Sequence, residues 1–367
     1  MTSSTDSGAG SPAIPGAGAL DGAHACGAIF ASPAWQQAWS EATVEPTLAQ
    51  RLVSAGRVVT GEPLPQSISA VELRLLSESP FWRGYEQDAG VPELWTGLTA
   101  YLSTVYAISS PLNALPVTEA SRIVDRSRQV GGDWGAEALI VPNIERRDLI
   151  SHLVEHHKPD GLVRLDATCR LRLPNSMDEY LGALGKSVRT ELRRGHRRAE
   201  ERGVTFGQLQ GEAAINLVEE YVELTTASAE KHNIPALYDV PTLRAVLRIP
   251  GARLLTAERE GHLLAGIVAL SADATLVLWS GGIRYSALKD YHPYTFLLYE
   301  TISASIGQGL NWVDFGRGNL DFKSRRGFIP TDLWTVIYLL NTDEPDRRRR
   351  QLADMHDRLT AFLGRSA

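Results

Sequence analysis

The sequence predicts an α/β protein of two lobes with a mixed, mostly antiparallel sheet. The 367 residues correspond to about two domains at ~150 residues each. Hydrophobic residues make up 43% and charged residues 22%, which is typical of compact soluble proteins. Three strands are expected in quick succession at 252–259, 262–271 and 274–280, joined by short turns, which predicts an antiparallel meander.

The second half of the chain is expected to form one α/β module of ~180 residues. Apolar and polar residues alternate over 161–173, as in a half-buried strand. Ser176 is a helix cap, and a strongly basic helix follows over 187–202. The remaining predicted elements are strands at 204–209, 312–315 and 333–338, and helices at 213–232, 241–247 and 294–307.

The first half gives weaker signals, because prolines interrupt it repeatedly between 40 and 118. A helix is expected to begin at Ser32–Pro33, and a further helical stretch at 69–76. A helix at 118–130, a strand at 138–142 and a helix at 146–157 follow. This alternation predicts a second α/β lobe whose element order the sequence leaves open.

The two ends differ in composition from the body. Residues 1–28 are rich in Gly, Ala, Ser and Pro and lack the basic region of a secretory signal, so a disordered leader without export is expected. Residues 346–367 predict a C-terminal helix that packs Leu352, Leu359 and Leu363 on the body. The expected division is therefore leader 1–28, N-terminal lobe 29–160, C-terminal lobe 161–345 and terminal helix 346–367.

Charge and cysteine content exclude several classes of protein. The net charge is −6, so a polyanion must be held by a local patch and not by the whole surface. Two cysteines, Cys26 and Cys169, exclude a disulfide framework and a cysteine zinc site, and fit a reducing cytoplasm. No window reaches the ~18 apolar residues of a membrane span.

The basic helix is the clearest candidate for such a patch. Six Lys or Arg lie between 186 and 198 against one acid, and Arg189, Arg193 and Arg197 share one face at i, i+4 spacing. This stripe predicts an anion site for the phosphates of CoA, of a nucleotide-linked precursor or of the acceptor end of tRNA. The alternative is a solvated helix face balanced by nearby glutamates.

Three segments carry a family resemblance: HPYTFLLYE at 292–300, GLNWVDFGRG at 309–318 and DFKSRRG at 321–327. Together with the element order, they resemble the Fem-type GNAT-fold acyltransferases, which include the FemABX aminoacyl transferases and BioF-like proteins. The resemblance covers roughly 160–340, and 30–160 by organisation only. It implies tandem GNAT-like lobes, the second better formed, and acyl transfer to a primary amine without a metal or redox cofactor.

The resemblance also implies a site around the third segment. Lys323, next to Phe322, matches the family lysine that contacts substrate or the developing negative charge, whereas the alternative is a solvated loop lysine. Asp314 is either a structural strand-end residue or a carboxylate that opens into the site. Arg317, between two glycines, is expected to bind a ligand phosphate or carboxylate, or else to pair with Asp314 or Asp321.

Aromatic residues and a histidine gather before the helix at 294–307. A tyrosine there, Tyr294 or Tyr285, has the chemistry to return a proton to the leaving group, and His292 to accept one from the amine. The alternative is aromatic core packing. A separate histidine cluster, His152, His156 and His157, lacks the spacing of a metalloprotease and predicts a polar helix end.

The donor is expected to be aminoacyl-tRNA, because the acyl-CoA signature Gln/Arg-x-x-Gly-x-Gly/Ala ahead of a helix is absent. The acceptor is expected to be a small-molecule amine, such as a cell-wall precursor or a natural product. Two alternatives stay open: an acyl-CoA-dependent enzyme, and a GNAT-fold binding or assembly subunit without catalysis.

Overall fold

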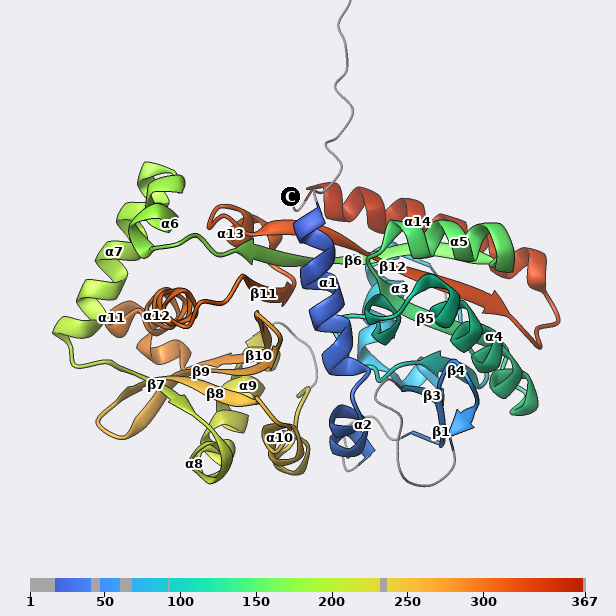
Figure 1. The fold of residues 1–367 in the computed structure, drawn as a ribbon, viewed down its shortest axis with the longest axis horizontal. Helices are drawn as coiled ribbons and strands as arrows, with labels where there is room; N and C mark the ends of the chain where they lie inside the picture. The colour runs from blue at the N-terminus through green and yellow to red at the C-terminus, as the bar shows by residue number, and fades with distance from the viewer. Residues whose placement is uncertain (1–16, 41–46, 60–67, 92, 232–235, 366–367) are drawn as a thin grey trace, which may run out of the picture.

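The computed structural model describes residues 17–40, 47–59, 68–91, 93–231 and 236–365. One sheet of twelve strands crosses the molecule in the order β2-β1-β3-β4-β5-β12-β6-β11-β10-β9-β8-β7 (Figure 1). Only β4–β5 and β10–β11 pair in parallel among these described strands. The prediction of a mixed, mostly antiparallel sheet is therefore confirmed.

The strands have the following bounds: β1 Ala49–Val53, β2 Val58–Val59, β3 Ser69–Arg74, β4 Thr99–Leu102, β5 Ala138–Ile144, β6 Gly161–Arg172, β7 Thr205–Leu209, β8 Arg253–Arg259, β9 His262–Ala272, β10 Thr275–Ile283, β11 Trp312–Arg317 and β12 Ile329–Leu339. The helices are α1 Ala17–Phe30, α2 Pro33–Ser40, α3 Pro80–Ala89, α4 Val117–Asp133, α5 Arg147–His157, α6 Met177–Ala183, α7 Lys186–Glu201, α8 Gly211–Ile215, α9 Val218–Lys231, α10 Val240–Leu247, α11 Leu288–Tyr291, α12 Pro293–Gly307, α13 Leu320–Ser324 and α14 Pro345–Arg365, with short 3-10 turns η1 Leu76–Glu78, η2 Pro111–Ala114 and η3 Tyr285–Ala287.

Two strands join the halves of the sheet. The long strand β6 pairs with β12 over most of its length and with β11 near its end. β12 also pairs with β5 of the first half. The two lobes therefore share one continuous sheet, and the contact between them is formed by backbone hydrogen bonds as well as by side chains.

Helices cover both faces of each half, as Figure 1 shows. In the second half, α7 and α12 pack on one face, where Leu192 and Phe296 enter the core, and α8 to α10 pack on the other. In the first half, α4 and α5 cover one face, whereas α3 and α14 contribute to the core on the other. Each face is buried because apolar residues alternate along the strands.

The prediction of a helix at 69–76 is wrong. Residues 69–74 form β3, which pairs with β1 on one side and β4 on the other, and all six residues are buried. Pairing on both edges satisfies the backbone of the strand, and this tertiary context overrides local helix propensity.

The prediction of a disordered leader is wrong for residues 17–28, which form part of α1, while residues 1–16 lie outside the described residues. Figure 1 places α1 between the two halves. Its small residues allow a close approach: a Cβ at Gly27 would lie 2.8 Å from the backbone nitrogen of Ala114. The Ala and Gly residues of α1 therefore allow close packing of the helix and do not indicate a flexible segment.

The other predicted elements form with small shifts in their ends, except that the segment 213–232 divides into α8 and α9. In α14 the side chains of Leu352, Leu359 and Leu363 are buried as expected. None of the described helices is long and apolar enough to cross a membrane.

Candidate functional site

Strands β10 and β11 diverge at the centre of the sheet. They pair only from Thr275–Val277 to Trp312–Asp314, after which β10 continues alongside β9 to Ile283. Gly316 has a φ of +63°, and a Cβ there would lie 3.5 Å from the carbonyl oxygen of Leu278. Glycine thus allows β11 to turn away while its backbone stays close to β10.

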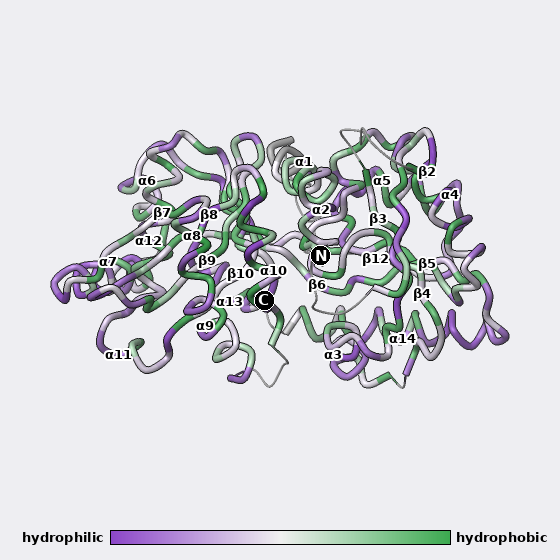
Figure 2. Tube along the Cα trace, turned by 90° about the horizontal axis from the view of Figure 1, so that it is seen from below, coloured by the Kyte–Doolittle hydropathy of each residue, from purple (hydrophilic) through white to green (hydrophobic). Residues whose placement is uncertain are grey.

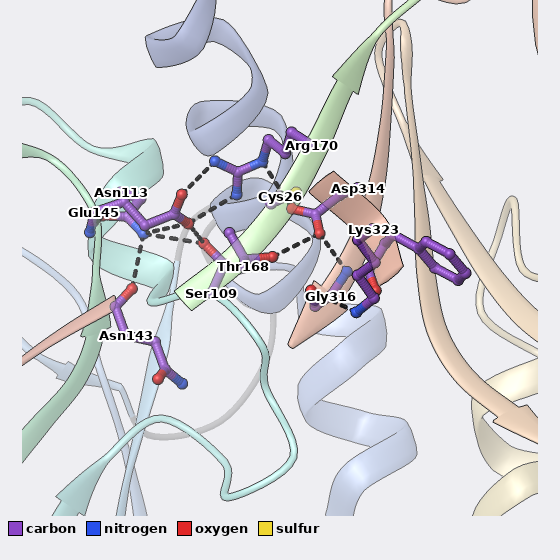
Figure 3. Close-up of polar contacts among 11 residues, drawn as sticks. Cys26, Ser109, Asn113, Asn143, Glu145, Thr168, Arg170, Asp314, Gly316 and Lys323 are labelled. Atoms are coloured by element: carbon purple, nitrogen blue, oxygen red, sulfur yellow. Dashed lines mark hydrogen bonds and ion pairs between the residues drawn. The ribbon is translucent and has the colours of Figure 1, made fainter. Parts of the chain in front are cut away.

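Asp314 lies at the point of divergence and is fully engaged with the protein (Figure 3). Its Oδ1 accepts hydrogen bonds from the hydroxyl of Thr168 at 2.8 Å and from the backbone N–H of Gly316 at 2.7 Å. Its Oδ2 lies 2.7 Å from Nε of Arg170 and accepts from the thiol of Cys26 at 3.3 Å. These contacts tie the turn of β11 to β6 and to α1.

Arg170 links this aspartate to the first lobe. Its guanidinium also binds both carboxylate oxygens of Glu145, which follows β5, and Ser109 donates to Glu145 Oε1 at 2.8 Å (Figure 3). Although burial opposes its charge, Glu145 and Asp314 raise the pKa of Arg170 well above its usual range. Burial, together with Asp314, raises the pKa of the Cys26 thiol.

Sequence reasoning missed Arg170 and Glu145. The alternation along 161–173 predicts that the polar face of β6 contacts solvent, whereas Thr168 and Arg170 are buried. The sequence did contain a signal for a buried polar cluster, because Asp166 and Arg170 carry charge on the same strand face as Thr168. Ionised groups in a strand near the middle of a sheet need partners wherever helices cover that face.

Lys323 is buried on α13 and is not a solvated loop lysine. Its Nζ donates to the backbone carbonyls of Phe315 at 2.7 Å, Gly316 at 3.0 Å and Arg317 at 2.6 Å. An ammonium has three donors, so the end of β11 uses all of them. Burial lowers the pKa of Lys323 to about 8.

Arg317 points toward the first lobe. Its Nη1 donates to the hydroxyl of Tyr85 at 3.0 Å and its Nη2 to the carbonyl of Ala107 at 3.1 Å. Among the described residues the carboxylates of Asp314 and Asp321 pair instead with Arg170 and Arg325. Arg317 also lines a small cavity of about 20 Å³ together with aromatic side chains of α3, which is room for about one water molecule.

The start of α12 lies near Arg194 and Arg198 of α7 and near Arg202, which follows α7. His292 is the N-cap residue, and Gly195 allows the two helices to cross closely, since a Cβ there would lie 2.8 Å from Cγ2 of Thr295. Burial lowers the pKa of His292, and the nearby charges of Arg198, Arg202 and Arg194 lower it further. The histidine is therefore neutral near pH 7.

The predicted stripe of Arg189, Arg193 and Arg197 lies on another face of α7. Arg193 is 3.7 Å from Asp178 and Arg197 is 3.5 Å from Glu201, and all four side chains are more than half exposed. Arg189 donates to the carbonyl of Leu181 at 3.5 Å. Figure 2 shows α7 as a hydrophilic segment at one end of the molecule.

The aromatic candidates pack around the end of β11. The ring of Tyr294 lies 5.6 Å from that of Phe322 and 6.1 Å from that of Phe315, and burial raises the pKa of its hydroxyl. Tyr285 lies in η3, before α12 in the chain, and Nζ of Lys231 is 4.0 Å from the centroid of its ring. The structure thus groups Asp314, Phe322, Lys323 and Tyr294, places His292 at the start of α12 and leaves the predicted arginine stripe at the surface.

Comparisons with known proteins concern one domain of the chain and its overall fold. The family described as acetyltransferase (GNAT) domain matches residues 186–324. FemX has a similar structure, with a TM-score of 0.56, 12% sequence identity and coverage of 88% of this chain and 96% of FemX. A conserved protein of unknown function from Bacteroides thetaiotaomicron VPI-5482 has a TM-score of 0.50 and 9% sequence identity, with coverage of 86% of this chain and 92% of that protein. L-PGS from Bacillus licheniformis has a TM-score of 0.49 and 13% sequence identity, with coverage of 78% of this chain and 86% of L-PGS.

No curated protein matches the sequence. At 12% identity the likeness to FemX concerns the fold, and that fold includes both lobes because it covers nearly all of each chain. The segment that matches the acetyltransferase domain contains α7, the meander, α12, β11 and α13. Residues 186–324 therefore match the acetyltransferase (GNAT) domain family, and the chain as a whole shares its fold with FemX.

Proposed function

We propose that this protein forms amide bonds by moving an aminoacyl group from aminoacyl-tRNA to a primary amine of a cell-wall precursor or a small natural product. The fold and the matched domain support acyl transfer in general. The choice of donor depends on the connection that precedes α12.

That connection, residues 284–292, contains no glycine and is wound into η3 and α11. The acyl-CoA signature of the GNAT fold requires glycines in the loop ahead of a helix, because their exposed N–H groups contact phosphates. In helical turns these N–H groups are used internally, as in Ala287, which donates to the carbonyl of Arg284 at 2.9 Å. This observation carries the choice of aminoacyl-tRNA over CoA.

Arginines near the start of α12 supply positive charge for the phosphates of a nucleic acid. Arg194, Arg198 and Arg202 are close enough to His292, at the start of α12, to lower its pKa, and the helix dipole there also favours an anion. The exposed Arg193 and Arg197 continue this charge along α7. A tRNA acceptor end that follows α7 would keep its phosphates beside these arginines and bring its ester toward the diverging strands.

The reaction needs little covalent chemistry from the protein. The amine nitrogen attacks the ester carbonyl, a C–N bond forms, and the C–O bond to the ribose breaks. Neutral His292 accepts the proton that the amine loses, and the protonated hydroxyl of Tyr294 supplies one to the leaving oxygen. Lys323 acts by holding the backbone of β11 in shape and by placing a positive charge near the carbonyl oxygen.

The experiment is a transfer assay with purified protein and a panel of amines. Radiolabelled aminoacyl-tRNA is expected to lose its label to one of the amines, and acyl-CoA is expected to remain intact. Consumption of acyl-CoA alone would favour the CoA-dependent alternative, and consumption of neither donor would favour a binding subunit. As a matched pair, Arg194→Ser/Arg198→Ser should slow transfer more than Arg193→Ser/Arg197→Ser.

A further inference from the structure

Three side chains between α4 and α5, remote in sequence from the GNAT domain, form a serine, histidine and aspartate relay. Oγ of Ser121 lies 2.6 Å from Nε2 of His157. Nδ1 of the same ring lies 3.1 Å from Oδ1 of Asp125. Ser121 and Asp125 are one helical turn apart on α4, and His157 is the last residue of α5.

This order of contacts is the one that activates a serine. The carboxylate fixes the imidazole with its proton on Nδ1, so Nε2 is left as the acceptor facing the hydroxyl. The His157 side chain is only 6% exposed, which limits competition from water at the ring, whereas the Asp125 side chain is 61% exposed. Nucleophile, base and orienting group are thus all within hydrogen-bond reach, the arrangement by which such sites are recognised regardless of fold.

Burial and the groups around the ring together keep His157 in its basic form. Arg128 from α4 and His152 and His156 from α5 act to lower the pKa of His157, and Asp125 acts to raise it. Burial is the largest effect, and the net result is a lowered pKa for His157. The ring centroid of Tyr338, from β12, lies 6.5 Å from that of His157.

An open groove of about 610 Å³ begins at the aspartate of this relay. Arg122, Arg126 and Arg128 line it together with Asp125, Gln129 and Leu340. Arg126 also donates to the carbonyl of Gly56 at 2.7 Å, and Arg128 lies over the ring of Tyr338. The excess of guanidinium groups over carboxylates favours a ligand that carries a carboxylate or a phosphate.

We infer that Ser121 is a nucleophile, activated by His157 and Asp125, that cleaves small activated esters bearing an anionic group. Oγ bonds to the ester carbonyl carbon and the alcohol leaves, while His157 takes the hydroxyl proton and passes it to that alcohol. Water then attacks the acyl-serine and releases the acid. This site is independent of the proposed aminoacyl transfer, since it uses none of the same residues.

The test is covalent labelling of the full chain with a fluorophosphonate, in which the serine oxygen bonds to phosphorus and fluoride leaves. Mass spectrometry is expected to find the phosphoryl group on Ser121 in the wild type and in Ser151→Ala, an exposed serine of α5 that serves as the matched control. Ser121→Ala should lose the label. His157→Gln should label about 100-fold more slowly, the usual contribution of a general base.

Circular dichroism and thermal melting establish that each variant is folded. Asp125→Asn provides a second test, because this substitution at the surface should give a labelling rate between those of the wild type and His157→Gln. With 4-nitrophenyl esters, the hemisuccinate should be cleaved faster than the acetate, and Arg122→Ser should reduce that preference. An unlabelled Ser121 in folded protein, or a labelling rate unchanged in both His157→Gln and Asp125→Asn, would overturn the inference.

Discussion

Replacing Arg170 with methionine is expected to lower the free energy of unfolding by about 3–5 kcal/mol, the usual cost of removing one partner from a buried ion pair. Arg170 contacts both Glu145 and Asp314, whose side chains are each 1% exposed. Methionine fills a similar length but leaves two buried carboxylates without their cation. The lower part of the range is expected, because Thr168 and Ser109 continue to donate hydrogen bonds to these carboxylates.

The assay is urea unfolding followed by tryptophan fluorescence and by circular dichroism. Arg193→Met is the matched control: its ion pair is mostly exposed, so its effect should stay within about 0.5 kcal/mol. Adding Glu145→Gln and Asp314→Asn to Arg170→Met removes the uncompensated charges and should recover part of the loss. A loss below about 1 kcal/mol in Arg170→Met alone would refute the view that this cluster is a buried electrostatic link between the lobes.

Three further predictions concern the second half of the chain. Burial lowers the pKa of Lys323 from 10.5 to about 8, so the unfolded chain binds more protons than the folded chain between these two pH values. The free energy of unfolding of the wild type, relative to that of Lys323→Met, should therefore rise with pH across this window. Urea titrations at a series of pH values measure this difference. Arg194→Ser/Arg198→Ser should lower kcat/KM for a polyanionic donor by about tenfold and weaken the salt dependence of kcat/KM in steady-state assays; an unchanged salt dependence would count against phosphate binding at α12. Gly195→Val should lower the unfolding free energy by about 1–3 kcal/mol in chemical denaturation because its Cβ would meet Thr295, and a neutral result would mean that α7 and α12 can separate without cost.

Local signals in the sequence determined most of the elements of the second half. The Ser176 hydroxyl accepts from the N–H of Glu179 at 3.2 Å, as its position before a helix predicts. The meander formed because its corners suit tight turns, with positive φ at Glu260, Gly261 and Asp273. Caps, turns and alternation act over a few residues, so they can be recognised without knowledge of the rest of the chain.

The environment of the site depended on tertiary structure. Lys323 was found from its motif, but the inward direction of its amine depends on how α13 folds back over β11. The polar face of β6 is buried because α1 and the lobe junction cover it, and this brings Cys26 to Asp314 across 288 positions of sequence. The sequence alone determined which segments form helices and strands, since those preferences are local. Only the folded chain decided which charges lose their water, because burial is set by segments that are distant in the sequence.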